Sequence, residues 1–201
     1  MPLRRADLLA GAAIVAAYLG VRSGRTDPLD AAITRAVGHR VPPRVDRAVA
    51  AVTDVGSVYG ASGITAALAA TGHRRTAVEV AFSSAMAWTG AQAAKPLLHR
   101  PRPYETRASE RTVAIPAGSS WPSGHAAVAA AVATVVAERA TPRTRWLLAT
   151  AVAGVGLSRL QVGVHHATDV LAGVGTGVLS GRLATVLRSR IGRRARPARR
   201  H

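Results

Sequence analysis

The sequence predicts an all-α protein, a polytopic membrane helical bundle of about six transmembrane helices. Three observations support this fold class. Hydrophobic residues make up 48% of the chain, although aromatic residues make up only 3%. The hydrophobic residues, among which alanine is the commonest, gather in long apolar runs that short polar breaks separate. The cations lie in those breaks instead of spreading over helix faces, which is the pattern of membrane proteins.

The first apolar run covers residues 6–21 and follows a short basic N-terminus. A signal peptide has the same arrangement. Several similar runs follow, however, and no convincing cleavage site separates this run from them. A spanning helix needs about 20 residues, so the run is only marginally short. We therefore expect a first transmembrane helix here.

Residues 27–41 have helical periodicity with one apolar face, formed by Leu29, Ala32, Ile33, Ala36 and Val37. Asp30 and two arginines lie on the other faces of this helix, and a Pro-Pro pair at 42–43 ends it. We expect an amphipathic helix at the membrane surface. It would be an ordinary soluble helix only if the apolar runs did not span a membrane.

Five further apolar runs cover residues 48–71, 76–94, 122–137, 146–164 and 167–187. The last run is rich in glycine and alanine, which suits closely packed membrane helices. Asp54 and Glu79 lie inside runs but near their ends, so we expect both carboxylates at the membrane interface. Residues 1–187 then form one transmembrane domain, and residues 188–201 form a basic cytoplasmic tail.

Six spans place both termini on one side of the membrane. The basic breaks at 72–75 and 139–145 then share the cytoplasmic side with the termini, as the positive-inside rule requires. The polar loops at 95–121 and 159–165 lie together on the extracytoplasmic face. The arginines of residues 22–47 fall on that face as well, against the rule. We expect a multi-pass protein of the plasma membrane whose tail contacts anionic lipid.

The formal net charge of +17 would suggest a nucleic-acid partner in a soluble protein. Because the charges are clustered between apolar runs, we expect no nucleic-acid partner. The chain has no cysteine, which excludes disulfides, thiolate metal sites and cysteine nucleophiles. Lys95 is the only lysine, which hints at a position that needs a compact ammonium group. The oligomeric state stays open.

Two polar segments of the predicted outer face each suit an anion. In the first, Lys95 and Arg102 stand seven residues apart. The second, Pro-Ser-Gly-His at 122–125, begins a predicted helix, where free N–H groups and the helix dipole favour an anion. Gly124 allows its close approach and Ser123 adds a hydroxyl donor.

The third segment, residues 158–169, contains Arg159, His165 and Asp169. If the chain is helical from His165 onward, the imidazole and the carboxylate lie at i and i+4, close enough for a hydrogen bond. Such a bond fixes the tautomer and leaves the other ring nitrogen free as a nucleophile or base. Taken alone, each segment has an equally good structural explanation: the first is a basic loop, the second is an ordinary N-cap, and the third contains a loop histidine. Together, their cations, histidines and carboxylate favour an anion-binding catalytic site.

The pattern K-x6-R-P, P-S-G-H and S-R-x5-H-x3-D resembles the three-part signature of the type-2 phosphatidic acid phosphatase superfamily. That family includes membrane lipid phosphatases, soluble bacterial acid phosphatases and vanadium haloperoxidases. All three parts match without a gap between residues 95 and 169, and the six predicted spans resemble the membrane branch. Of the doubled His165 and His166, the spacing selects His165, because only it precedes Asp169 by four residues.

The resemblance implies that His165 attacks phosphorus to form a phosphohistidine while Asp169 holds its tautomer. His125 then protonates the leaving alkoxide and afterwards activates the hydrolytic water. The other signature residues bind the phosphoryl oxygens: Lys95, Arg102, Ser123, Gly124 and Arg159. With three cations and a helix N-terminus available, we expect no metal or other cofactor, and activity that survives a chelator.

A phosphate site at the membrane face suits a lipid phosphate whose tail stays in the bilayer. The candidates are phosphatidate, phosphatidylglycerophosphate and a polyprenyl phosphate or diphosphate. The heavy use of Arg, Ala and Gly suggests a high-GC bacterium, in which polyprenyl carriers serve envelope synthesis. Three alternatives stay open. The first is a vanadate-dependent haloperoxidase with the same pocket. The second is a non-catalytic basic membrane scaffold, and the third is a soluble acid phosphatase whose apolar runs are core helices.

Overall fold

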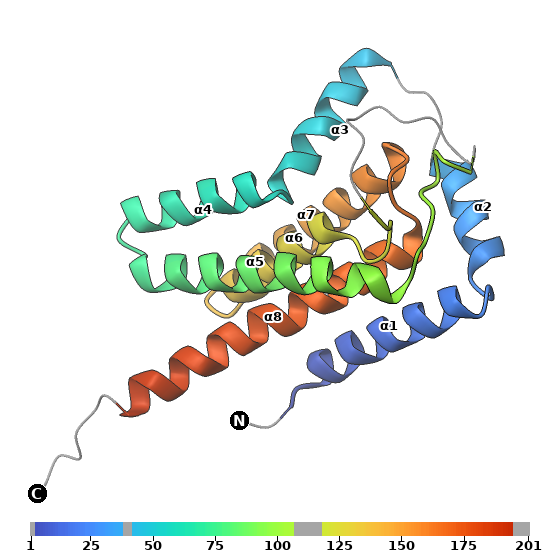
Figure 1. Cartoon of the computed structure of the whole chain (residues 1–201). Coiled ribbons are helices and arrows are strands. Elements are labelled where there is room, and N and C mark those ends of the chain that lie inside the picture. Colours follow the sequence, from blue (N-terminus) through green and yellow to red (C-terminus); the bar gives the residue numbers. More distant parts are fainter. Residues whose placement is uncertain (1–2, 38–41, 107–117, 195–201) are drawn as a thin grey trace, which may run out of the picture.

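In the computed structural model, residues 3–37, 42–106 and 118–194 are described, and all their regular elements are helices (Figure 1). The α-helices are α1 (Arg5–Arg22), α2 (Asp27–Val37), α3 (Pro43–Val55), α4 (Val58–Ala70), α5 (Arg74–Ala94), α6 (Gly124–Ala137), α7 (Pro142–Gln161) and α8 (Ala167–Arg194). A short 3-10 helix, η1 (Lys95–Leu97), follows α5 directly. The predicted all-α class is confirmed.

Capping residues explain several of these boundaries. The Ser57 hydroxyl accepts a hydrogen bond from the Gly60 amide and caps α4, and the Thr141 hydroxyl accepts one from the Thr144 amide and caps α7. These bonds satisfy N–H groups that the first helical turn leaves without a partner. Gly72, with a φ of 84°, forms the turn between α4 and α5.

The run at 48–71, predicted as one helix, is two helices that meet at Gly56 and Ser57. Gly56 is buried, and a Cβ there would lie 2.6 Å from Val155 Cγ1 and 2.9 Å from the His125 carbonyl oxygen. The chain thus passes directly against α6 and α7 at this point, and Ser57 starts a new helix beyond it. Periodicity alone does not reveal such a break, because both halves are equally apolar.

The centre of the bundle is α6, which packs against α5, α7 and α8 (Figure 1). Its buried side chains are alanines and valines, so the surrounding helices approach closely. Gly173 and Gly177 of α8 face α6, where an added Cβ would collide with the carbonyl oxygens of Ser123 and Ala127. The expectation of close packing for the last run is therefore confirmed.

Ion pairs join several helix ends at the end of the bundle away from α2. The Arg182 guanidinium contacts Asp7 at 3.0 Å and Glu138 at 3.2 Å. Glu79, which is only 3% exposed, pairs with Arg139 at 3.0 Å and also with Arg188. The beginning of α1, the α6–α7 turn and the later part of α8 therefore lie together.

Two expectations concern this end of the bundle. Glu79, expected at the membrane interface, has its carboxylate buried among these cations, and its depth in a membrane stays a prediction. The predicted domain boundary after residue 187 falls within α8, which continues through Arg194, and Arg188 takes part in the Glu79 pairing. Asp54, in contrast, is exposed in the last turn of α3.

By length and hydropathy, one described helix is able to cross a membrane by itself, over Ala167–Arg190. A second qualifies if α1 and α2 are taken as one span bent by 100°. The number of about six spans stays a prediction.

Candidate active site

The three predicted polar segments meet at the end of the bundle opposite those ion pairs. The Tyr104 amide donates to the Gly163 carbonyl at 3.2 Å, which joins the loop after η1 to the α7–α8 turn. The Ser123 amide donates to the Asp169 carbonyl at 2.9 Å, which joins the start of α6 to the first turn of α8. Gly163 has a φ of 71°, so the turn that delivers His165 requires a residue without a Cβ.

Three cations lie on the inner side of this junction. Arg102 is 1% exposed, and its guanidinium donates to the Val164 carbonyl at 2.8 Å. The Lys95 ammonium donates to the Ser119 carbonyl at 2.5 Å. Arg159, near the end of α7, is 5% exposed, and its Nε has no hydrogen-bond partner among the described residues.

These cations are close enough to repel one another. Burial, followed by the charge of Arg102, lowers the pKa of Lys95 to about 8, while Asp169 acts in the opposite direction. Buried like charges are costly unless an anion compensates them. The cluster of Lys95, Arg102 and Arg159 is therefore a site prepared for an anion.

Ser123, Gly124 and His125 lie at the start of α6, next to that cation cluster. The Ser123 hydroxyl accepts from the Ala126 amide at 3.4 Å, so it also acts as an N-cap. Among the described residues, this hydroxyl donates to no protein acceptor. Gly124 opens the helix beside Trp88, and His125 is within electrostatic range of Arg159 and His165. The segment can thus present a hydroxyl, a backbone amide and an imidazole to a bound anion.

The predicted hydrogen bond between His165 and Asp169 is not made in this structure. Nδ1 of His165 is 3.7 Å from Oδ2 of Asp169, which exceeds hydrogen-bond length, and no other described residue bonds to it. The reason is local: α8 begins at Ala167, so His165 precedes the helix. Oδ2 of Asp169 instead accepts from the His166 amide at 2.8 Å and closes the N-terminus of α8.

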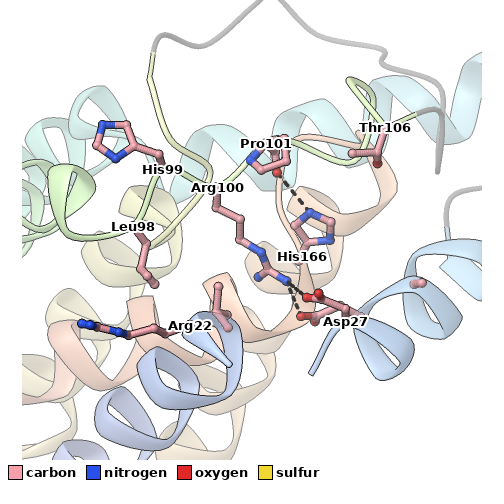
Figure 2. Close-up of a pocket in the computed structure, with 11 residues that line it drawn as sticks. Arg22, Asp27, Leu98, His99, Arg100, Pro101, Thr106 and His166 are labelled. Atoms are coloured by element: carbon pink, nitrogen blue, oxygen red, sulfur yellow. Dashed lines mark hydrogen bonds and ion pairs between the residues drawn. The ribbon is translucent and has the colours of Figure 1, made fainter. Parts of the chain in front are cut away.

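His165 is nevertheless the histidine that faces the cations. It is 4% exposed, and burial lowers its pKa to about 4, although Asp169 raises it. The imidazole is therefore neutral near pH 7, with Nδ1 turned toward Asp169 and Nε2 as its other nitrogen. His166 points elsewhere, and its Nε2 lies 3.2 Å from the Pro101 carbonyl (Figure 2).

Two functional candidates escaped the sequence analysis. Arg100 is only 9% exposed and holds the carboxylates of Asp30 and Asp169 at 2.6 and 2.7 Å. Asp30 was predicted on the polar side of an amphipathic helix, yet it is 1% exposed. No sequence signal distinguishes Arg100 from the other arginines of its loop. On a helical wheel of α2, Asp30 lies off the apolar face that was expected to make the contacts, so its burial was not predicted. The α2 helix itself is confirmed, while residues 38–41 lie outside the described part.

A cavity of about 500 Å³ lies beyond Arg100, between α2 and the loop after η1 (Figure 2). Asp27, Asp30, Arg100 and His166 are among its lining residues. Of the signature residues, none lines this cavity. It borders the network behind the candidate site and not the cation cluster.

The comparisons with known proteins agree with this geometry. The sequence model of the PAP2 superfamily, which is the type-2 phosphatidic acid phosphatase superfamily, matches residues 76–193, and these include all three polar segments. The fold is similar to that of the first transmembrane PAP2-type phosphatidylglycerolphosphate phosphatase from Bacillus subtilis, with a TM-score of 0.79, 19% identity, and 94% of this chain and 98% of that chain covered. The fold is also similar to that of Aquifex aeolicus LpxE, with a TM-score of 0.67, 21% identity, and 77% of this chain and 93% of that chain covered. No curated protein matches the sequence.

Proposed function

Because the chain belongs to the PAP2 superfamily, we propose that it is a membrane phosphatase that hydrolyses a lipid phosphate through a phosphohistidine. One observation carries the proposal: a buried, neutral imidazole, that of His165, lies beside the Asp169 carboxylate and within electrostatic range of Arg102 and Arg159. A neutral imidazole beside an anion site is equipped to attack phosphorus. The resemblance of the signature to those of lipid phosphatases supports the same reaction.

In the first step, Nε2 of His165 forms a bond to phosphorus while the bond to the leaving alkoxide breaks. The imidazole becomes positive, and Asp169, 3.7 Å from Nδ1, stabilises that charge. His125, whose protonated form the bound phosphate favours, gives that proton to the alkoxide and becomes neutral. In the second step, His125 takes a proton from water, the hydroxide attacks phosphorus, and the P–N bond breaks to release phosphate.

The cations Lys95, Arg102 and Arg159 stabilise the equatorial oxygens in both steps, with the Ser123 hydroxyl and the Gly124 amide. Their positive charge performs the role that a metal ion has in other phosphoryl-transfer enzymes. We therefore expect turnover in the presence of a chelator.

A membrane location is supported by the distribution of large apolar side chains. The buried apolar residues are mostly alanine and valine, whereas large ones point outward, among them Leu9, Val78, Trp146 and Leu147, which are 62–76% exposed. A soluble acid phosphatase would bury such side chains, because large exposed apolar surface is unfavourable in water. With an active site at one end of such a bundle, the substrate we favour is a lipid phosphate: phosphatidate, phosphatidylglycerophosphate or a polyprenyl phosphate or diphosphate.

The proposal is tested by phosphate release from these lipids in detergent with a chelator present. We expect turnover by the wild type, loss of turnover in His165→Ala, and retention of most turnover in His166→Ala. The second variant is the matched control, since His166 is the adjacent histidine but faces Pro101. An acid-labile phosphoenzyme should accumulate on His165 when the reaction is quenched with base.

Equal turnover by both variants and the wild type would refute the phosphohistidine mechanism. Halide oxidation that depends on vanadate, without phosphate release, would establish the haloperoxidase alternative instead.

A further inference from the structure

Arg100 joins two buried carboxylates behind the candidate site. Its Nη1 donates to Oδ1 of Asp169 at 2.7 Å, and its Nη2 donates to Oδ2 of Asp30 at 2.6 Å. The side chain of Arg100 is 7% exposed, and those of the two aspartates are 1% and 0% exposed. Buried charges persist when they are paired and hydrogen-bonded, and this fork geometry supplies both.

Thr168 closes the network into a ring. Its amide donates to Oδ1 of Asp30 at 3.0 Å, and its hydroxyl donates to Oδ2 of the same carboxylate at 2.6 Å. The Thr168 hydroxyl also accepts from Arg100 at 2.6 Å. Asp30, from α2, therefore binds the first turn of α8, where a carboxylate is favoured by the free amides and the helix dipole.

This network leaves Asp169 little freedom to rotate. Its Oδ1 is held by Arg100, and its Oδ2 is held by the His166 amide while it faces Nδ1 of His165. Arg100 compensates one of the two carboxylates, so the ring keeps one net negative charge. That charge is complementary to the positive imidazole that forms when His165 accepts a phosphoryl group.

We propose that Arg100 and Asp30 are positioning residues for phosphoryl transfer, which fix Asp169 against His165 and thereby tie α2 to the catalytic centre. The proposal rests on the proposed function, because it concerns the histidine that takes the phosphoryl group. Neither residue touches the substrate in this scheme, so both act on the rate of transfer and not on the binding of the phosphate. Substrate affinity is left to the cation cluster.

The test compares Asp30→Asn with Asp27→Asn. Both aspartates lie on α2, and Asp30 is 2.6 Å from Nη2 of Arg100. Asp27 is 3.7 Å from the same nitrogen and 65% exposed (Figure 2). We expect Asp30→Asn to lower kcat by about tenfold to a hundredfold, by analogy with the loss of outer hydrogen-bond partners that orient metal-bound histidines. KM should stay within about twofold of the wild type, because ground-state binding is unchanged. Asp27→Asn should resemble the wild type in both constants.

Two further measurements separate positioning from simple loss of structure. The inhibition constant of orthovanadate reports on the cation cluster, and it should be the same in Asp30→Asn and the wild type. In Arg100→Ala, added guanidinium ion should restore part of the lost kcat, because the neighbouring cavity of about 500 Å³ gives it access to the vacated position. Arg100→Lys keeps the charge but not the two-pronged hydrogen bonding of the guanidinium, so its kcat should lie between those of the wild type and Arg100→Ala.

The proposal is overturned if Asp30→Asn keeps the wild-type kcat. It is equally overturned if kcat, vanadate inhibition and thermal stability fall in parallel, since that pattern describes a scaffold residue. A wild type without phosphatase turnover refutes the proposed function and this inference with it, whereas turnover by the wild type with an unaffected Asp30→Asn refutes this inference alone.

Discussion

The protonation of Lys95 gives the most direct test of the electrostatics of the site. The structure places the pKa of this ammonium at about 8, against an ordinary value of 10.5, because burial and the charge of Arg102 outweigh the attraction of Asp169. At pH 9, about one Lys95 in ten should carry its charge, whereas an unperturbed lysine would be almost fully charged. On the proposal that the protonated form binds phosphate, kcat/KM should fall about tenfold for each pH unit above the Lys95 pKa of about 8.

The assay uses the fact that Lys95 is the only lysine. Reductive methylation with ¹³C-formaldehyde labels this side chain and the α-amino group, so one lysine resonance can be followed as the pH is raised. We expect its midpoint near pH 8. Orthovanadate should raise the midpoint, because a bound anion favours the charged form of the ammonium.

The enzyme kinetics supply the second half of the test. In Lys95→Arg the guanidinium stays protonated over the accessible pH range, so any remaining turnover should no longer decline near pH 8. A lysine resonance with a midpoint near the ordinary value would refute the reasoning. A decline near pH 8 that persists unchanged in Lys95→Arg would assign that decline to another group.

The remaining predictions concern the bundle and its C-terminal part. Gly177→Ala should destabilise the protein by about 1–3 kcal/mol, measured by thermal unfolding in detergent, because the new Cβ meets the Ala127 carbonyl. Gly63→Ala is the matched control: an added Cβ there has nothing within 4 Å, so stability should be equal or higher, and equal losses in both variants would contradict the packing argument. A chain shortened after Arg194 should keep most of its turnover and its melting temperature. A chain shortened after Leu187 should melt at a lower temperature, because it loses the pairing of Arg188 with Glu79, and identical melting of the two would remove any role for that pair.

The helices and the three polar segments were accessible from the sequence because their signals are local. Apolar runs placed α1, α5, α6, α7 and α8 near their observed positions. The signature spacing selected His165 over His166, and in the structure the His165 imidazole lies 3.7 Å from the Asp169 carboxylate whereas that of His166 contacts the Pro101 carbonyl. The catalytic roles of these residues remain predictions until the variants are measured.

What escaped the sequence depends on contacts between distant segments. The break at Gly56 exists because α6 and α7 approach the chain there. Glu79 is buried by arginines that lie 60 or more positions away. The distance of 3.7 Å between His165 and Asp169 follows from the start of α8 at Ala167, which the helical-spacing argument placed two residues too early.

The sequence by itself determined the all-α class, the family resemblance and the set of phosphate-binding candidates, since each depends on periodicity or on fixed spacing along the chain. Only the tertiary structure decided which arginine supports the Asp169 carboxylate. Arg100 and Asp30 are separated by 70 positions, and they meet because burying two carboxylates requires a cation between them. That requirement acts between distant segments and leaves no periodic trace in the sequence, so α2 could be predicted as a helix but not as the helix that contacts the first turn of α8.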